Sequence, residues 1–210
     1  MTPLGVKMRA MRDTPRLILA STSRYRRDLL QRLRVPFDVV SPEVDETPIA
    51  GEASGALAER LAMAKAVAVA SKHLDAVVIG SDQVAELDGL SIGKPHTHAR
   101  ATAQLRAMSG RQVVFHTAGA VVRHDRHFAR GLLAPVMVTF RSLSDAEIER
   151  YLLAEQPYDC AGSAKSEALG IALLAAIESD DPTALVGLPL IRTCTLLREA
   201  GLDPLESAAP

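Results

Sequence analysis

The chain contains few aromatic residues: phenylalanine, tyrosine and tryptophan make up 3% of its 210 residues, and tryptophan is absent. A chain of this length can bury a substantial core, which must here be built mainly from alanine, leucine, valine and isoleucine. Cysteine is also scarce, because Cys160 and Cys194 are the only two. Two thiols make neither a disulfide framework nor a zinc site of thiolates alone. We expect both to be small buried apolar residues in a reducing compartment.

The sequence has no excess of charge of either sign, since 24 basic and 25 acidic side chains give a net charge of −1. Proteins that bind the phosphates of nucleic acid usually carry a basic excess, so we expect no nucleic-acid partner and only a local anion site. No apolar run approaches the ~20 residues that span a bilayer, and no membrane partner is expected.

Residues 1–15 contain three basic side chains but no continuous apolar segment, unlike a signal peptide. We therefore expect a disordered extension at 1–15, a single domain at 16–210, and a cytoplasmic location.

Short apolar runs alternate with longer amphipathic segments along the chain. Patterns typical of strands occupy 17–20, 37–41, 76–80, 83–87, 90–93, 113–122 and 136–140. Patterns typical of helices occupy 24–33, 56–72, 98–108, 144–155 and 189–200, while 171–177 fits either a strand or a helix. Asp88-Gly89 predicts a hairpin turn, and Ser144 with Glu147 predicts a capping box. The alternation predicts an α/β architecture.

The first strand-to-helix junction, residues 20–27, reads Ala-Ser-Thr-Ser-Arg-Tyr-Arg-Arg. A helix N-terminus presents unpaired N–H groups and the positive end of the helix dipole, so arginines there are unfavourable for the helix itself. An anion bound at the junction would resolve this conflict. The alternative is a capped surface helix with solvated arginines.

Carboxylates follow two other segments. Asp45 and Glu46 lie in a loop between prolines, where they are either solvated or hold Mg²⁺, which prefers oxygen ligands. Asp82 follows the buried run 76–80, and ligands of open α/β sheets bind at the carboxyl ends of strands. The alternative for Asp82 is a carboxylate that caps a turn.

Two lysines have unusual neighbours. Lys65 interrupts the apolar stretch 61–67, and Lys94 lies between Gly93 and Pro95. Each alone is typical of an exposed or snorkelling lysine, but beside an arginine-rich junction both become candidate phosphate ligands. The sequence contains neither a P-loop nor the paired-glycine dinucleotide fingerprint.

Together these segments resemble the Maf family of nucleoside triphosphate pyrophosphatases. The resemblance extends over nearly the whole chain, and several separated motifs occur in the same order. The matching stretches are 17–30, 41–47, 61–66, 80–84, 93–95, 109–111, 159–167 and 187–190.

The resemblance implies a central mixed twisted sheet flanked by helices, with a cleft between two lobes, often in a homodimer. It also implies hydrolysis of a nucleotide substrate between the α and β phosphates with Mg²⁺ or Mn²⁺. Asp82 would be the catalytic carboxylate, as proton acceptor or metal carrier, and Glu46 would help to hold the metal. The residues that would contact the triphosphate are Ser21, Ser23, Arg26, Arg27, Lys65 and Lys94.

Three positions are similar to the branch that hydrolyses 7-methyl-GTP. Tyr25 stands where the common form has arginine and this branch often has tryptophan, Gln83 follows the catalytic position in place of threonine, and Glu167 replaces glutamine. Methylation at N7 makes guanine cationic, and the face of an aromatic ring attracts a flat cation. A carboxylate accepts hydrogen bonds from the guanine N–H groups. Tyr25 and Glu167 would supply these two functions.

Departures from the family pattern are modest, with Arg24 in place of a proline, Ala164 in place of a phenylalanine and Ala168 in place of a glycine. They affect the base pocket and leave the catalytic set intact. Two alternatives remain open. One is the same reaction with dTTP, UTP or another non-standard nucleotide. The other is a nucleotide-binding regulator of cell division with little turnover, against which the intact carboxylates weigh.

Overall fold

The computed structural model describes residues 15–208, so residues 1–14 of the extension expected at 1–15 lie outside the described part. The described strands form one sheet in the order β2-β1-β3-β5-β6-β7, with β4 paired to β3. β1 is parallel to β2 and β3, and the other pairs are antiparallel. The predicted α/β class with a central mixed sheet is confirmed. The strands are β1 (Leu17–Ala20), β2 (Phe37–Val40), β3 (Val77–Leu87), β4 (Leu90–Ile92), β5 (Gln112–Arg123), β6 (Phe128–Phe140) and β7 (Leu174–Glu178).

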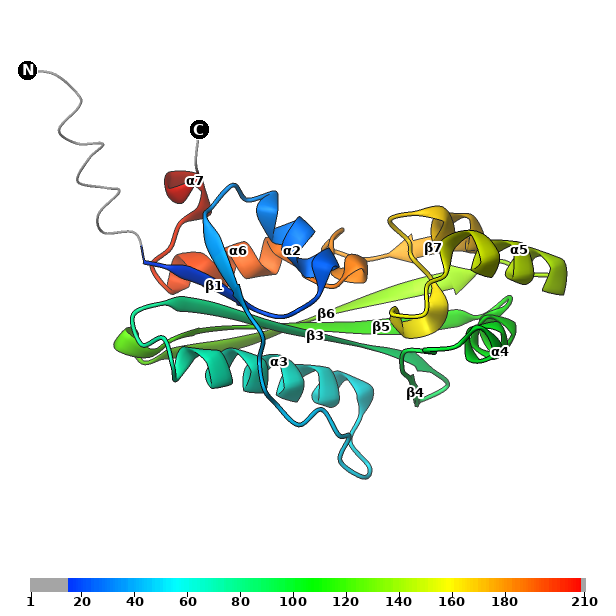
Figure 1. The fold of residues 1–210 in the computed structure, drawn as a ribbon, viewed down its shortest axis with the longest axis horizontal. Coiled ribbons are helices and arrows are strands. Elements are labelled where there is room, and N and C mark those ends of the chain that lie inside the picture. Colours follow the sequence, from blue (N-terminus) through cyan, green and yellow to red (C-terminus); the bar gives the residue numbers. More distant parts are fainter. Residues whose placement is uncertain (1–14, 209–210) are drawn as a thin grey trace, which may run out of the picture.

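Helices cover both faces of the sheet (Figure 1). α3 lies along one face, α2 and α6 cover the other face near β1, and α4 and α5 lie at the far end near β7. Separate buried clusters underlie α3, the α2–α6 pair and the α4–α5 pair. None of the helices within residues 15–208 is long and apolar enough to cross a membrane. Their bounds are α2 (Arg24–Gln31), α3 (Ser54–Ala70), α4 (His98–Met108), α5 (Asp145–Glu155), α6 (Leu190–Glu199) and α7 (Pro204–Ser207).

The contact between α3 and β3 is unusually close. A Cβ atom on Gly80 would lie 2.2 Å from the Ala62 carbonyl oxygen and 2.6 Å from the Ala66 backbone nitrogen. Only glycine fits there, because such separations are far inside van der Waals contact. The small residues of α3 that face the sheet allow this approach, and Lys65 is thereby placed directly over β3 beside Asp82.

The prediction of two strands at 76–80 and 83–87 is wrong, because β3 continues without interruption from Val77 to Leu87. The polar pair Ser81-Asp82 interrupts the apolar pattern but not the pairing, since β5 pairs with β3 from Val77 to Glu86. The parallel partner β1 ends opposite Gly80. Asp82 therefore lies within a strand, just beyond the point where its neighbour stops and the sheet surface opens.

Three other differences concern the second half of the chain. β6 begins at Phe128, eight positions before the predicted start at 136, and pairs with β5 throughout. The ambiguous segment 171–177 divides into a 3-10 turn at Leu169–Leu173 and the strand β7. The short helix α7 was not predicted. Long-range pairing with β5 outweighs the weak local pattern in β6.

The predicted capping box opens α5. The Ser144 hydroxyl accepts from the Glu147 backbone N–H, and the Glu147 carboxylate accepts from the Ser144 N–H at 2.8 Å. These hydrogen bonds from Ser144, together with one from Arg141, lower the pKa of Glu147 to about 2.

A carboxylate with a depressed folded-state pKa stabilises the fold above its unfolded pKa and loses that effect as the pH falls. We expect Glu147→Gln to have an unfolding midpoint a few degrees below wild type at pH 7. The difference should shrink as the pH falls from about 4.5 towards 2, as measured by thermal denaturation. A difference that is constant with pH would contradict this.

Candidate active site

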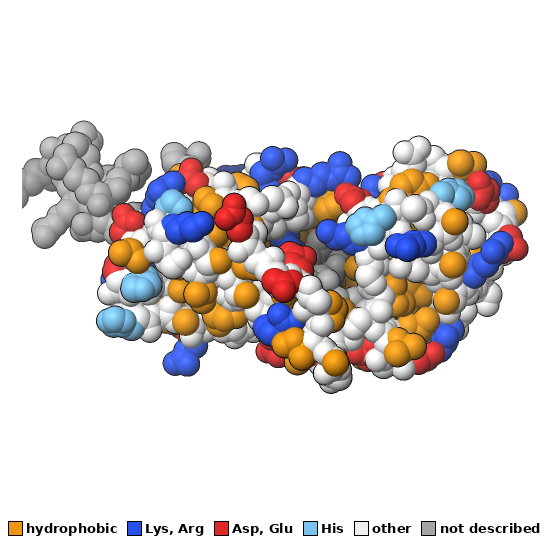
Figure 2. Space-filling view, turned by 60° about the horizontal axis from the view of Figure 1, so that its bottom comes forward, with side chains coloured by type: hydrophobic (Ala, Val, Ile, Leu, Met, Phe, Trp, Pro, Cys, Tyr) orange, Lys and Arg blue, Asp and Glu red, His pale blue; other side chains and the backbone are white. Residues whose placement is uncertain are grey.

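A cleft of about 1090 Å³ lies where β1 ends and β3 continues. Figure 2 shows it as a hollow near the middle of the molecule with acidic and basic side chains at its rim. Its walls come from the β1–α2 junction, the loop after β2, α3, β3, the β4–α4 loop, and two segments of the second half of the chain, 156–167 and 185–187. Two lobes with a cleft between them are therefore present, as the resemblance implied.

At one end of the cleft the β1–α2 junction presents hydroxyls and a guanidinium. Ser23 is the N-cap of α2, and its hydroxyl accepts from the Arg26 backbone N–H. The Arg26 Nε donates to the Gly187 carbonyl oxygen at 2.9 Å and Nη1 donates to the Ser21 hydroxyl at 3.4 Å. Burial lowers the pKa of Arg26, against the opposing effect of the Asp82 and Glu46 carboxylates. Both acceptors of the guanidinium are uncharged. Its positive charge is therefore available to attract an anion in the cleft.

The centre of the cleft holds a buried lysine between two carboxylates. Lys65 Nζ lies 2.7 Å from Glu46 Oε1 and 2.7 Å from Asp82 Oδ1. Lys65 and Asp82 are 5% and 9% exposed, whereas Glu46 comes from the exposed loop. Burial opposes ionisation of Glu46, but the Lys65 ammonium outweighs it and lowers the Glu46 pKa. The adjacent Asp45 is not in this cluster, because its carboxylate accepts from the Thr47 N–H within the loop.

The cleft offers two carboxylates, Glu46 and Asp82, to the metal that the resemblance implies. Within residues 15–208 no group of three or more histidine, cysteine or carboxylate side chains converges. Mg²⁺ is commonly held by one or two carboxylates, with phosphates and water completing the octahedron. Glu46 and Asp82 therefore fit a metal that arrives with a triphosphate. Lys94 lines the same cleft and is exposed. Its charge contributes to the lowered pKa of Glu46.

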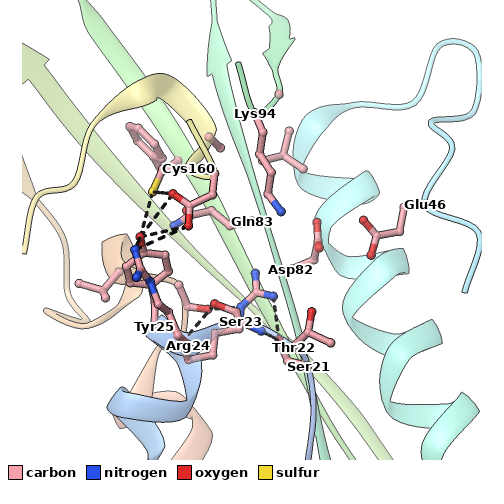
Figure 3. A pocket seen from close by; sticks show the side chains of 18 of the residues that line it. Ser21, Thr22, Ser23, Arg24, Tyr25, Glu46, Asp82, Gln83, Lys94 and Cys160 are labelled. Carbon is pink, nitrogen blue, oxygen red and sulfur yellow. Dashed lines mark hydrogen bonds and ion pairs between the residues drawn. The ribbon is translucent and has the colours of Figure 1, made fainter. Parts of the chain in front are cut away.

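The opposite end of the cleft carries an aromatic ring and carboxylates (Figure 3). The Tyr25 hydroxyl lies 3.3 Å and 3.4 Å from the two carboxylate oxygens of Asp159 and accepts from Arg24 Nη2 at 2.7 Å. The Arg24 guanidinium also lies over the ring, 4.8 Å from its centroid. Glu167 lines this end and is exposed. Tyr25 thus spans the cleft from α2 to the loop after α5.

Gln83 lies beside Asp82 in β3 but faces the other side of the strand. Its amide nitrogen donates to the Thr117 hydroxyl at 2.8 Å and to the carbonyl oxygens of Leu185 and Ala184 at 2.9 Å and 3.2 Å. The side chain also lines the cleft. β3 therefore contributes Asp82 and Gln83 to the cleft from its two opposite faces.

The structure brings all but one of the predicted site residues to the cleft. Arg27 is the exception, because it lies beside its neighbour Asp28 and lines a separate shallow groove on α2 and β2. We leave Arg27 out of the phosphate set. The residues that meet at the cleft are Ser21, Ser23, Tyr25, Arg26, Glu46, Lys65, Asp82, Gln83, Lys94 and Glu167.

The loop after α5 supplies residues to which the sequence analysis gave no role. Asp159 contacts Tyr25, and the Cys160 thiol, half-buried at the cleft wall, lies 3.4 Å from Asp159 Oδ1. Burial raises the pKa of Cys160 to about 12, so the thiol stays protonated. The expectation that both cysteines are buried is wrong, since Cys160 and Cys194 are each only partly buried. The small residues of 157–170 are typical of a loop, but they do not indicate its contact with Tyr25.

The fold and the cleft define an α/β protein whose cleft combines a carboxylate–lysine cluster, further cationic side chains and an aromatic, acidic side. The chain belongs to the family described as Maf-like protein, whose model matches residues 16–200.

Its relatives include three proteins named 7-methyl-GTP pyrophosphatase. The protein from Polaromonas sp. is 62% identical over 205 residues, covering 96% of this chain and 94% of the relative. The protein from Albidiferax ferrireducens is 64% identical over 190 residues, with 90% and 96% covered. The protein from Bordetella avium is 58% identical over 197 residues, with 94% and 99% covered.

Proposed function

We propose that this chain is a 7-methyl-GTP pyrophosphatase, which hydrolyses 7-methyl-GTP to 7-methyl-GMP and pyrophosphate. The observation that carries the proposal is one cleft that joins the buried Lys65–Asp82 pair and the cations of Arg26 and Lys94 to an aromatic, acidic side at Tyr25 and Glu167. Cations, a carboxylate and an aromatic ring suit, respectively, the triphosphate, the attacking water and the cationic base of such a substrate. The named relatives at 58–64% identity support the same substrate.

The triphosphate binds at the β1–α2 junction. The hydroxyls of Ser21 and Ser23 and the first N–H groups of α2 donate to phosphate oxygens, as helix N-termini commonly do. Arg26 and Lys94 supply positive charge, and Lys65 supplies it at the centre of the cleft. Because Gly187 and Ser21 fix the Arg26 guanidinium before substrate arrives, little reorganisation is needed as charge develops.

Hydrolysis takes place at the α phosphorus. A water oxygen attacks that atom, its proton passes to the Asp82 carboxylate, and the bond from the α phosphorus to the bridging oxygen breaks to release pyrophosphate. Lys65 holds and orients the Asp82 carboxylate through its 2.7 Å contact. A divalent cation, Mg²⁺ or Mn²⁺, held by Glu46 and Asp82 together with the phosphates, would neutralise charge on the phosphate oxygens.

The products identify the bond that is cleaved. Reaction of 7-methyl-GTP in water enriched in oxygen-18 should give equal amounts of 7-methyl-GMP and pyrophosphate, with the label in 7-methyl-GMP. Formation of 7-methyl-GDP and orthophosphate would overturn the proposed reaction.

The base binds between Tyr25 and the acidic loop. The Tyr25 ring attracts the methylated, cationic purine through its face, and Glu167 accepts from the guanine N–H groups. The Asp159 carboxylate holds the Tyr25 hydroxyl and adds negative charge near the cation.

Substitution at these positions should change selectivity more than catalysis. We expect Tyr25→Ala to lower the ratio of kcat/KM for 7-methyl-GTP to that for GTP about 2- to 30-fold, the range of a cation–π contact. Glu167→Gln should lower the same ratio by removing the charge that favours the cation. Tyr25→Phe, which keeps the ring, is the matched control and should retain most of the ratio. Unchanged selectivity in both Tyr25→Ala and Glu167→Gln would rule out this base pocket.

We further propose that the enzyme acts in the cytoplasm and as a homodimer. Support for the homodimer comes from the resemblance to the family and from exposed apolar side chains along the sheet edge at β7, including Ile171 and Ile177.

A further inference from the structure

The Tyr25 ring, to which we assign the purine, is already in contact with a cation of the protein. The Arg24 guanidinium lies over the ring, 4.8 Å from its centroid, and its Nη2 donates to the Tyr25 hydroxyl at 2.7 Å. A guanidinium and a methylated purine are both flat cations, and the face of an aromatic ring attracts either of them. Arg24 therefore makes, within the protein, the contact that the proposed function assigns to the base (Figure 3).

The same guanidinium offsets the acidic group beside the ring. The Tyr25 hydroxyl donates to Asp159 at 3.3 Å, and Arg24 Nη2 lies 3.8 Å from the same carboxylate. All three residues line the cleft. The negative charge of Asp159 is thus partly neutralised before a nucleotide arrives, and its attraction for a cationic base is reduced.

Arg24 is held loosely. It is the first residue of α2, where the positive end of the helix dipole disfavours a cation, and the first turn of this helix has no acidic residue. Within residues 15–208, Tyr25 and Asp159 are the only hydrogen-bond and ion-pair partners of its guanidinium. The side chain is 59% exposed, and exposed ion pairs contribute little. A ligand can therefore displace the guanidinium at small cost.

We infer that Arg24 is an internal cation of the base pocket, which competes with a cationic purine for the Tyr25 ring and lowers the selectivity for 7-methyl-GTP over GTP. The inference rests on the proposed function and adds a specificity-determining residue to it. A neutral guanine can stack on the ring while the guanidinium stays. A methylated guanine must displace the guanidinium or lie close to a like charge, well within the ~10 Å over which exposed charges interact.

The competition also acts on the product. 7-methyl-GMP keeps the cationic base after pyrophosphate has left, so Arg24 weakens the binding of this product and favours its release. A pocket with Tyr25 and Asp159 but without the arginine would hold 7-methyl-GMP more tightly. Arg24 therefore lowers selectivity and, by the same contact, speeds release of the cationic product.

The test replaces Arg24 with methionine, which is similar in length and carries no charge. We expect Arg24→Met to raise the ratio of kcat/KM for 7-methyl-GTP to that for GTP about 2- to 5-fold, the range of an exposed cation–π contact. Arg27→Met is the matched control, because Arg27 is another exposed arginine of α2 and lies beside Asp28 outside the cleft. Its ratio should equal that of the wild-type protein.

Three results would overturn the inference. The first is a lower ratio in Arg24→Met, which would mean that the arginine supports the ring. The second is an unchanged ratio with equal losses for both nucleotides, which would mean that Arg24 acts on the triphosphate. The third is an equal rise in Arg27→Met, which would mean that any positive charge on α2 has the effect.

A second background separates occupation of the ring from a general effect of charge. In Tyr25→Ala there is no ring to occupy, so Arg24→Met should raise the ratio less than it does when Tyr25 is present. An equal rise in the two backgrounds would contradict a competition for the ring.

Binding of the monophosphates separates this inference from the proposed function. The dissociation constants of 7-methyl-GMP and GMP, measured by calorimetry, should show tighter binding of 7-methyl-GMP in Arg24→Met and little change for GMP. A ratio of the two constants equal to that of the wild-type protein would contradict the inference. If the wild-type protein hydrolyses no triphosphate, the proposed function fails, and the ratio of dissociation constants still decides the role of Arg24.

Discussion

Asp82→Asn should lower kcat/KM for 7-methyl-GTP by about 10²–10⁴-fold, the usual contribution of a general base. Asparagine has nearly the same shape as aspartate but neither takes the water proton nor carries the charge that a cation needs. Lys65 would keep Glu46 as its partner, so we expect the variant to fold and to bind nucleotide. Steady-state pyrophosphate release measures the loss.

Asp38→Asn is the matched control for this substitution. Asp38 lies on β2, is exposed, and pairs with Arg16 at 2.6 Å outside the cleft, so its loss should leave the rate near wild type. If Asp82→Asn retained more than about a tenth of the activity, the assignment of Asp82 as the base would be wrong.

Lys65→Met is the second substitution with a large expected effect. It removes the ammonium that lies 2.7 Å from both carboxylates and leaves two like charges facing each other. Because Lys65 lowers the Glu46 pKa, its removal should raise that pKa and shift the acid limb of the pH–rate profile to higher pH. We expect kcat/KM to fall about 10²–10³-fold at pH 7, as when one fixed electrostatic partner is lost from an active site.

Lys72→Met controls for the loss of a lysine near the same helix. Lys72 follows α3, is 69% exposed, and lies 3.8 Å from Glu43, so its rate and pH profile should match wild type. An acid limb that stays in place in Lys65→Met would show that this lysine does not govern the ionisation of Glu46.

Short sequence patterns correctly predicted those features that depend only on neighbouring residues. The Asp88-Gly89 turn and the Ser144 capping box each depend on residues within four positions of one another, and both are present. The Asp88 and Gly89 φ angles of 53° and 78° are those that such a turn requires.

Features decided by distant residues were not predicted. The continuity of β3 through Asp82 depends on β5, and the contact of Tyr25 with Asp159 joins residues 134 positions apart. Arg27 shows a different limit, because adjacent residues on a helix point roughly 100° apart. When Arg26 faces the cleft, Arg27 must point away from it. The sequence motif alone does not show which of the two arginines faces the cleft.

The resemblance to the Maf family indicated which residues form the site, whereas their spacing along the chain did not. Glu46, Lys65 and Asp82 come from a loop, a helix and a strand, and the close packing of α3 on Gly80 sets Lys65 against Asp82. That packing requires that Gly80 has no side chain. A single sequence does not distinguish this glycine from any other.

The most direct test of the proposed function is kcat/KM for pyrophosphate release from 7-methyl-GTP, GTP, UTP and dTTP under identical conditions with Mg²⁺. The cleft, with Tyr25 and Glu167 at its base end, predicts the highest value for 7-methyl-GTP. A higher value for UTP or dTTP would contradict the assigned base pocket, and release from none of the four would contradict the proposed reaction itself.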